Sequence, residues 1–191
     1  MQTLHHDLIP ALWVIWLAYW LVASVRTKPV QRRESLGSRL SHIVLLVAGM
    51  ALLISRRHAG LLLTERFLPA AGWAFWLGAA LVAAGLAFAI WARVHLAGNW
   101  SGTVTLKQNH SLTRDGPYRF VRHPIYTGIL TAVLGTALVV GDWRGLLALA
   151  LVTLAFVRKI AIEERFLTDL FGEEYQRYRH EVPALIPRLG A

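Results

Sequence analysis

Long apolar runs separated by short polar segments make up most of the chain. Five stretches are close to the length of about 20 apolar residues that a helix needs to cross a bilayer. They are Leu8–Val25, Leu40–Ser55, Gly72–Ala97, Ile125–Val140 and Trp143–Ile160. The second and fourth are short, so either flanking residues extend them or they cross only in part. The pattern predicts an all-α polytopic membrane protein with about five transmembrane helices, and four spans is the main alternative.

Composition excludes the soluble classes of protein. Of the 191 residues, 55% are hydrophobic and only 16% are charged, with a mean hydropathy of +0.46. A soluble domain of this size could not bury so much apolar surface, and a disordered chain would carry far less of it. The chain contains no cysteine, which excludes disulfides, thiolate metal sites and cysteine nucleophiles.

The net charge of +9 does not indicate nucleic-acid binding, because the Lys and Arg residues fall between the apolar runs instead of clustering on a soluble face. Most of them follow the first, third and fifth spans. The positive-inside rule then predicts an N-terminus outside and a C-terminus in the cytoplasm. We expect a single integral membrane domain over residues 1–191 that contacts membrane lipids. Residues 1–97 would supply the N-terminal spans, and residues 98–191 a cofactor-binding loop, a helical hairpin and a tail.

Two kinds of side chain predict how the helices sit. Small residues recur every four positions in the fourth span and are expected to let another helix approach closely. These are Gly128, Ala132 and Thr136. Three tryptophans share one face of the first span, and we expect them to contact lipid and the membrane interface. These are Trp13, Trp16 and Trp20.

Polar residues concentrate in two segments that the charge pattern places on the cytoplasmic side. The first is the loop Gly98–Pro124, in which Pro124 keeps His123 out of helical geometry and so fixes a corner just before the fourth span. The second is the tail Arg158–Ala191, whose apolar residues recur at helical spacing. It predicts a C-terminal amphipathic helix that Gly172 breaks.

The turn Gly141-Asp142 joins the fourth and fifth spans into a tight antiparallel hairpin. Such a hairpin returns the end of the fifth span to the start of the fourth. The cations Arg122 and His123 should therefore meet the carboxylates Glu163 and Glu164. From the residues alone, an ion pair that pins the hairpin and a ligand site explain these charges equally well.

Two sequence blocks then resemble the isoprenylcysteine carboxyl methyltransferase family. The first is Gly116–Gly128, which reads G-P-Y-R-F-V-R-H-P-I-Y-T-G. The second combines the Glu163-Glu164 pair with F-G-E-E-Y at 171–175, then Tyr178 and Val182-Pro183. Both blocks keep the family's order and spacing over about Arg93–Pro187, whereas the N-terminal spans match only in hydrophobicity.

The resemblance implies a membrane methyltransferase that uses S-adenosylmethionine. It places five residues around the cofactor: Tyr118, His123, Pro124, Tyr126 and Gly128. Glu164, with Glu163 as a second candidate, would face the cofactor's amino group or sulfonium. Arg122 would lie nearest the methyl acceptor, and Arg122 and Glu163 are the catalytic candidates.

Possible methyl acceptors differ in whether they must lose a proton before they react. A carboxylate is already anionic at neutral pH and needs a cation such as Arg122 but no general base. An amine would have to lose a proton to Glu163, His123 or Tyr126. This favours a lipophilic carboxylate of the prenylcysteine type. Phospholipid amines, small thiols, an NADPH-dependent sterol-reductase-like protein and a non-enzymatic membrane subunit are the alternatives.

Two further polar residues lie at the end of the third span, on different helix faces. We favour Arg93 over His95 as a residue of the pocket wall or a phosphate contact, with a snorkelling arginine as the alternative. The other histidines lack the spacing of metal ligands, so no metal site is expected.

Overall fold

The computed structural model describes residues 2–24, 30–33, 35–54, 60–69, 71–96, 105–107 and 112–188. Its helices are α1 (Gln2–Ser24), α2 (Leu36–Ile54), α3 (Gly60–Leu63), α4 (Gly72–Leu96), α5 (Pro124–Val140), α6 (Trp143–Phe171) and α7 (Glu173–Glu181). A 3₁₀ turn, η2 (Gly116–Arg119), precedes α5. Two short strands, β1 (Val30–Arg33) and β2 (Thr105–Lys107), pair antiparallel and were not predicted. The parts of the expected polar loop at 98–104 and 108–111, and Ala97 at the end of the expected third span, lie outside the described residues.

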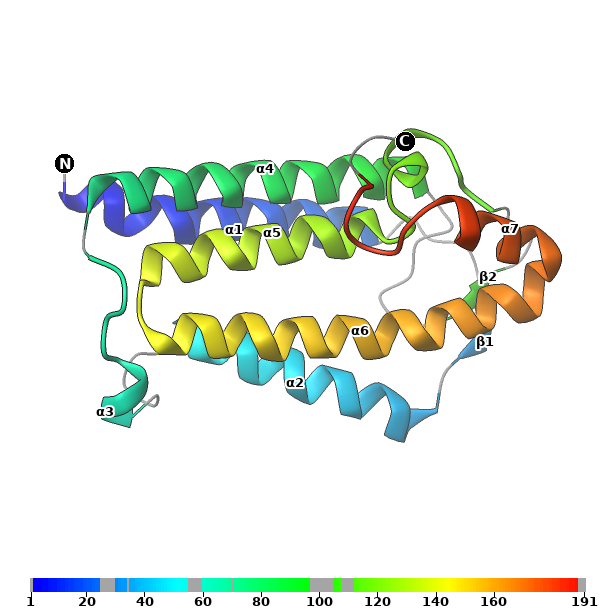
Figure 1. Cartoon of the computed structure of the whole chain (residues 1–191), viewed down its shortest axis with the longest axis horizontal. Coiled ribbons are helices and arrows are strands. Elements are labelled where there is room, and N and C mark those ends of the chain that lie inside the picture. The colour runs from blue at the N-terminus through cyan, green and yellow to red at the C-terminus, as the bar shows by residue number, and fades with distance from the viewer. Residues whose placement is uncertain are drawn as a thin grey trace.

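Five helices run along the long axis of the molecule and alternate in direction (Figure 1). Four of them, α1, α2, α4 and α6, are long and apolar enough to cross a membrane. The fifth, α5, is a shorter apolar helix of 17 residues, about 26 Å long at 1.5 Å per residue. The prediction of an all-α membrane protein with about five spans is confirmed.

The helices α4 and α5 approach so closely that there is no room for a Cβ atom at the glycines between them. A Cβ atom added to Gly85 would lie 2.4 Å from the carbonyl oxygen of Gly128, and one added to Gly78 would lie 2.6 Å from that of Gly135. Close backbone packing stabilises helix pairs in lipid, where the hydrophobic effect between helices is absent. The packing role predicted for the small residues of the fourth span is confirmed.

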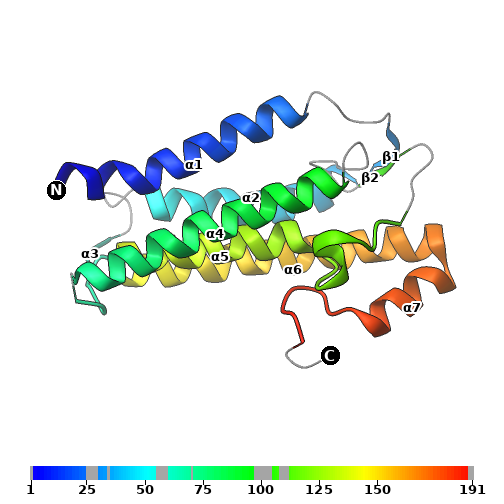
Figure 2. The same cartoon turned by 90° about the horizontal axis from the view of Figure 1, so that it is seen from above.

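The helix α6 is longer than the predicted span. It continues without a break from Trp143 past Ile160 to Phe171, and so includes the helix expected at the start of the tail. Gly172, with a φ of +54°, ends it as expected and allows α7 to fold back (Figure 2). The acidic pair therefore lies on a rigid extension of the hairpin instead of on a separate tail helix.

The expectation that the tryptophans of the first span contact lipid is wrong for Trp16, while Trp13 and Trp20 are half-buried and pack against the core. Trp16 is buried in a cluster with Val82 and Leu86 of α4. Trp13 is half-buried, and its Nε1 donates a hydrogen bond to the Thr136 hydroxyl of α5 at 3.1 Å. The face of α1 that carries these rings packs against the other helices, and the Trp13 N–H gains a partner there that hydrocarbon cannot supply.

Candidate functional site

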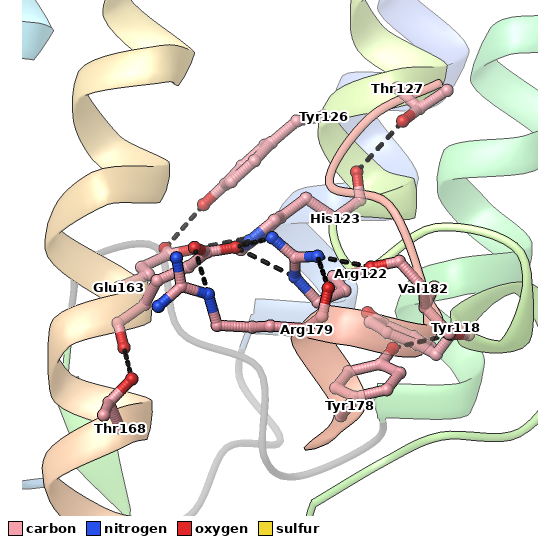
Figure 3. Close-up of polar contacts among 11 residues, drawn as sticks. Tyr118, Arg122, His123, Tyr126, Thr127, Glu163, Thr168, Tyr178, Arg179 and Val182 are labelled. Carbon is pink, nitrogen blue, oxygen red and sulfur yellow. Dashed lines mark hydrogen bonds and ion pairs between the residues drawn. The ribbon is translucent and has the colours of Figure 1, made fainter. Parts of the chain in front are cut away.

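The corner before α5 is built by local sequence. His123 stands at the N-terminal cap of α5 with φ −122° and ψ 60°, outside helical geometry, and Pro124 follows as the first helical residue. Gly141, in the left-handed conformation at φ +65°, turns the chain from α5 toward α6. The hairpin brings Glu163 and Glu164 to Arg122 and His123 as predicted (Figure 3).

Arg122 is committed to protein partners through its whole guanidinium group. Its Nε and Nη2 both donate to Glu164 Oε1, at 3.0 and 2.5 Å. Its Nη1 donates to the backbone oxygens of Arg179 and Val182. The Arg122 side chain is only 9% exposed. Arg122 therefore ties the corner to α6 and to the chain after α7.

Glu164 is the more heavily paired of the two carboxylates. Besides Arg122, it contacts Arg179, whose Nε lies 3.3 Å from Glu164 Oε2, and His123, whose Nε2 lies 3.2 Å from Glu164 Oε1. Opposite charges that are shielded from solvent attract each other more strongly than they do in water. The pair Arg122–Glu164 is therefore the centre of a small ionic network at one end of the bundle.

Glu163 lies beside this network and has different partners. The Tyr126 hydroxyl donates to Glu163 Oε1 at 2.6 Å, and His123 Nδ1 lies 3.6 Å from Glu163 Oε2 (Figure 3). Its side chain is 21% exposed, twice the value of Glu164. Glu163 is thus the carboxylate of the pair with more room for a further contact.

Aromatic rings border Glu163. The Tyr126 ring stacks on Phe156 of α6 with centroids 4.6 Å apart and lies parallel to the His123 ring at 5.7 Å. The ammonium of Lys159 lies 5.4 Å from the centroid of the Tyr126 ring. A carboxylate beside aromatic faces is a suitable environment for a cationic ligand group.

The chain after α7 is strapped across the corner, which the sequence did not indicate. The amides of Arg122 and His123 donate to the carbonyls of Pro183 and Ala184 at 2.9 and 3.0 Å. The Thr127 hydroxyl donates to the Leu185 carbonyl at 2.7 Å. The corner is therefore held from two sides, by α6 and by residues 182–185.

Tyr118, expected at the cofactor, is buried in a cluster with Ala92 of α4 and Ile125 of α5. Its carbonyl accepts a hydrogen bond of 2.6 Å from the Tyr178 hydroxyl. Burial raises the pKa of Tyr178 to about 12 and also raises the pKa values of Tyr118 and Tyr175. Since these hydroxyls stay protonated at physiological pH, the bond between η2 and α7 persists there.

Gly128 and Arg93 both contact helices other than α6, which carries the acidic pair. Gly128 faces Gly85 and Ala89 of α4. Arg93 is buried, and its Nη2 donates to the Ala23 carbonyl in the last turn of α1 at 2.8 Å. Burial excludes the snorkelling alternative for Arg93, whose guanidinium satisfies a carbonyl that the end of α1 leaves without a helical partner. A place for Arg93 in a pocket wall stays a prediction. His95, the residue not favoured, packs on Gly116 instead.

Comparison with known proteins gives matches over this same region. A family model described as phospholipid methyltransferase matches residues 73–174, more than half of the chain. The match contains both the corner at 122–128 and the acidic pair.

Several characterised relatives are similar to parts of the chain. The chain is 38% identical to a protein-S-isoprenylcysteine O-methyltransferase of Schizosaccharomyces pombe over 99 residues. This match covers 50% of this chain and 42% of the relative. Over 70 residues, 37% of this chain, it is 44% identical to methanethiol S-methyltransferase 1 of Bradyrhizobium diazoefficiens, of which 24% is covered. Over 82 residues, 42% of this chain, it is 33% identical to protein-S-isoprenylcysteine O-methyltransferase B of Arabidopsis thaliana, of which 42% is covered.

The matched regions thus span less than half the length of each of these relatives. They nevertheless bear out the resemblance to isoprenylcysteine carboxyl methyltransferases that the sequence motifs indicated.

Proposed function

Since the chain belongs to the phospholipid methyltransferase family, we propose that it transfers a methyl group from S-adenosylmethionine to a lipophilic acceptor. One observation carries the proposal. The family match contains both the corner and the acidic pair, which are 41 or 42 residues apart in sequence and in contact at one end of an apolar helix bundle.

The residues beside Glu163 fit the proposed cofactor. S-adenosylmethionine has a cationic ammonium and a cationic sulfonium, and it supplies an electrophilic methyl group when bound. Glu163, whose side chain is 21% exposed, and the rings of Tyr126 and His123 offer a carboxylate and aromatic faces to such cations. Glu164 is already engaged by Arg122, Arg179 and His123, so we assign the cofactor contact to Glu163 and not to Glu164.

Arg122 is better explained as a positioning residue than as the acceptor clamp expected from sequence. All three guanidinium nitrogens donate to Glu164 or to backbone carbonyls. Clamping an acceptor would require those bonds to break. We propose that Arg122 holds the corner so that His123, Pro124 and Tyr126 keep their places beside Glu163.

The chemistry needs orientation more than proton transfer if the acceptor is a carboxylate. A carboxylate oxygen forms the new O–CH₃ bond while the S–CH₃ bond breaks and its electron pair stays on sulfur, so no proton moves. Holding the two partners in line supplies much of the rate in such displacements. The chain's own contribution is to place the acceptor, to hold Glu163 through Tyr126 and to exclude water.

The proposed acceptor is a carboxylate of the prenylcysteine type, supported by the similarity to protein-S-isoprenylcysteine O-methyltransferases. The similarity to a methanethiol S-methyltransferase supports a small thiol as the second candidate. We further propose that the site faces the cytoplasm, as the positive-inside pattern predicts.

Purified protein in detergent tests the proposal directly. Calorimetry should detect binding of S-adenosylmethionine and no binding of NADPH. Radiolabelled cofactor should then transfer its methyl group to a farnesylcysteine acid and less to phosphatidylethanolamine or methanethiol. Binding of NADPH instead of S-adenosylmethionine would overturn the methyltransferase assignment, and transfer to methanethiol alone would overturn the carboxylate.

A further inference from the structure

Arg179 on α7 differs from Arg122 in how much of its guanidinium group is engaged. Its Nε lies 3.3 Å from Glu164 Oε2, and its side chain is 47% exposed, against 9% for Arg122. Within the described part of the chain, the Arg179 side chain donates no hydrogen bond, and Glu164 is its one ion-pair partner. Its terminal nitrogens Nη1 and Nη2 can therefore donate to a ligand without breaking an existing hydrogen bond.

The backbone of Arg179 is held at the corner although its side chain is half-exposed. Its carbonyl accepts a hydrogen bond of 3.1 Å from Arg122 Nη1. The preceding residue, Tyr178, is buried and donates from its hydroxyl to the Tyr118 carbonyl at 2.6 Å. The Arg179 side chain therefore starts from a fixed point, and it reaches from α7 toward the acidic pair on α6 (Figure 3).

Arg179 and Glu163 stand at the two ends of one chain of contacts. His123 Nδ1 lies 3.6 Å from Glu163 Oε2, and His123 Nε2 lies 3.2 Å from Glu164 Oε1, while Arg179 contacts the other oxygen of Glu164. The inner members of this chain, His123 and Glu164, are buried. Its ends are a carboxylate that is 21% exposed and a guanidinium that is 47% exposed. An anion and a cation that both have room for a ligand are complementary to an amino-acid group, which carries an ammonium and a carboxylate on one carbon atom.

We propose that Arg179 binds the carboxylate of the cofactor's amino-acid group while Glu163 takes its ammonium. The inference rests on the proposed function for its choice of ligand. The planar fork of Nη1 and Nη2 matches the two oxygens of a carboxylate.

The other carboxylate at this site is that of a lipophilic acceptor. Every exposed residue of α7 is polar, so Arg179 lies on a surface that the apolar part of an acceptor would avoid. The location of Arg179 therefore favours the cofactor as the source of the carboxylate.

The test compares S-adenosylmethionine with its decarboxylated form, which keeps the sulfonium and the ammonium, by calorimetry on the protein in one detergent. The unmodified protein should bind S-adenosylmethionine roughly tenfold more tightly, the low end for hydrogen bonds between charged groups because the site is half-exposed. Arg179→Met should abolish this preference by weakening the binding of S-adenosylmethionine alone. Arg177→Met, which removes an exposed cation from the same helix, is the matched control and should keep the parent's preference.

A purely structural role of Arg179 would weaken both ligands by the same factor and leave their ratio unchanged, which would overturn the proposal. Equal affinity of the unmodified protein for the two ligands would also overturn it. Should Arg179→Met fail to fold, this comparison and Arg179→Gln decide in the same way.

A second pair of ligands, S-farnesyl-N-acetylcysteine and its uncharged carboxamide, separates the two sources of carboxylate. The ratio of their affinities should be the same in Arg179→Met as in the parent. Loss of the acid preference in this pair, with the cofactor ratio unchanged, would overturn the assignment to the cofactor.

The outcome is also separable from that of the proposed function. Equal binding of both cofactor forms together with methyl transfer to a farnesylcysteine acid would keep the proposed function and remove the role of Arg179. A preference for S-adenosylmethionine that depends on Arg179, without transfer to any acceptor, would contradict the proposed function and leave the carboxylate contact standing.

Discussion

The two neighbouring carboxylates at the corner differ in their partners, and this separates their roles. Glu164 contacts three cationic or ionisable side chains, whereas Glu163 contacts a tyrosine hydroxyl and one imidazole nitrogen. A buried charge whose partner is removed costs stability, while a partly exposed charge with room for a ligand costs little. We therefore assign a structural role to Glu164 and a ligand-binding role to Glu163.

Replacing Glu164 with Gln tests the structural half of this assignment. The change leaves Arg122 and Arg179 without their carboxylate, so the free energy of unfolding should fall by about 1.5–3 kcal/mol, the range for hydrogen bonds to charged groups. Thermal unfolding in detergent measures the loss. Glu173→Gln, an exposed carboxylate in the first turn of α7, is the matched control and should change stability little. Equal stability of the two variants would contradict the ionic network.

Replacing Tyr126 with Phe tests the ligand-binding half. The variant keeps the ring against Phe156 but loses the hydroxyl that orients Glu163. Affinity for S-adenosylmethionine should fall by up to about tenfold, corresponding to one hydrogen bond of roughly 0.5–1.5 kcal/mol. The melting temperature should change little. An unchanged affinity measured by calorimetry would show that the Tyr126 bond does not prepare Glu163 for the cofactor.

At the scale of helices, the close contact of α4 with α5 positions the corner. Gly128→Ala would bring a Cβ to 2.4 Å from the Gly85 carbonyl oxygen, and that backbone atom cannot move aside cheaply. The helices must separate, and overpacking of this kind typically costs about 1–3 kcal/mol. Thermal unfolding should show the loss for Gly128→Ala. It should show none for Gly37→Ala, since a Cβ there meets nothing within 4 Å.

Cofactor binding by the Gly128→Ala variant distinguishes packing from ligand contact. If Gly128 only packs helices, as the structure indicates, affinity for the cofactor should follow the loss of stability and recover at lower temperature. A variant that keeps its melting temperature yet loses the cofactor would return Gly128 to the pocket that the family resemblance implies.

For the whole molecule, the alternation of the five long helices fixes which segments share an end. The segment between α3 and α4 lies at the end of the bundle away from the corner, where the Glu65 carbonyl accepts from the Trp143 amide, whereas α7, which carries Glu174, lies at the corner (Figure 1). Both side chains are exposed. The proposed orientation places Glu174 in the cytoplasm and Glu65 on the opposite side.

The absence of native cysteine makes this orientation directly testable. A membrane-impermeant maleimide applied to intact cells should label Glu65→Cys at once and Glu174→Cys only after permeabilisation. Labelling of both positions from one side would contradict the five-helix crossing. Labelling in the reversed pattern would keep the crossing but place the site outside the cytoplasm.

The sequence by itself determined the features that depend on local chemistry. Hydropathy gave the long helices, Pro124 and Gly141 gave the corner and the hairpin turn, and Gly172 gave the end of α6. In an antiparallel helical hairpin, the end of the second helix necessarily lies beside the start of the first. The meeting of Arg122 and His123 with the acidic pair could therefore be predicted without coordinates.

Only the tertiary structure decided which charged side chains pair with each other at the corner and in which direction single side chains point. It pairs Arg122 with Glu164, turns Arg93 to the end of α1, turns Trp16 inward and lays residues 182–185 over the corner. In helices that are apolar on nearly every face, hydropathy does not specify rotation about the helix axis. Close packing of glycines and the pairing of buried charges fix that rotation, and both depend on residues far apart in the sequence.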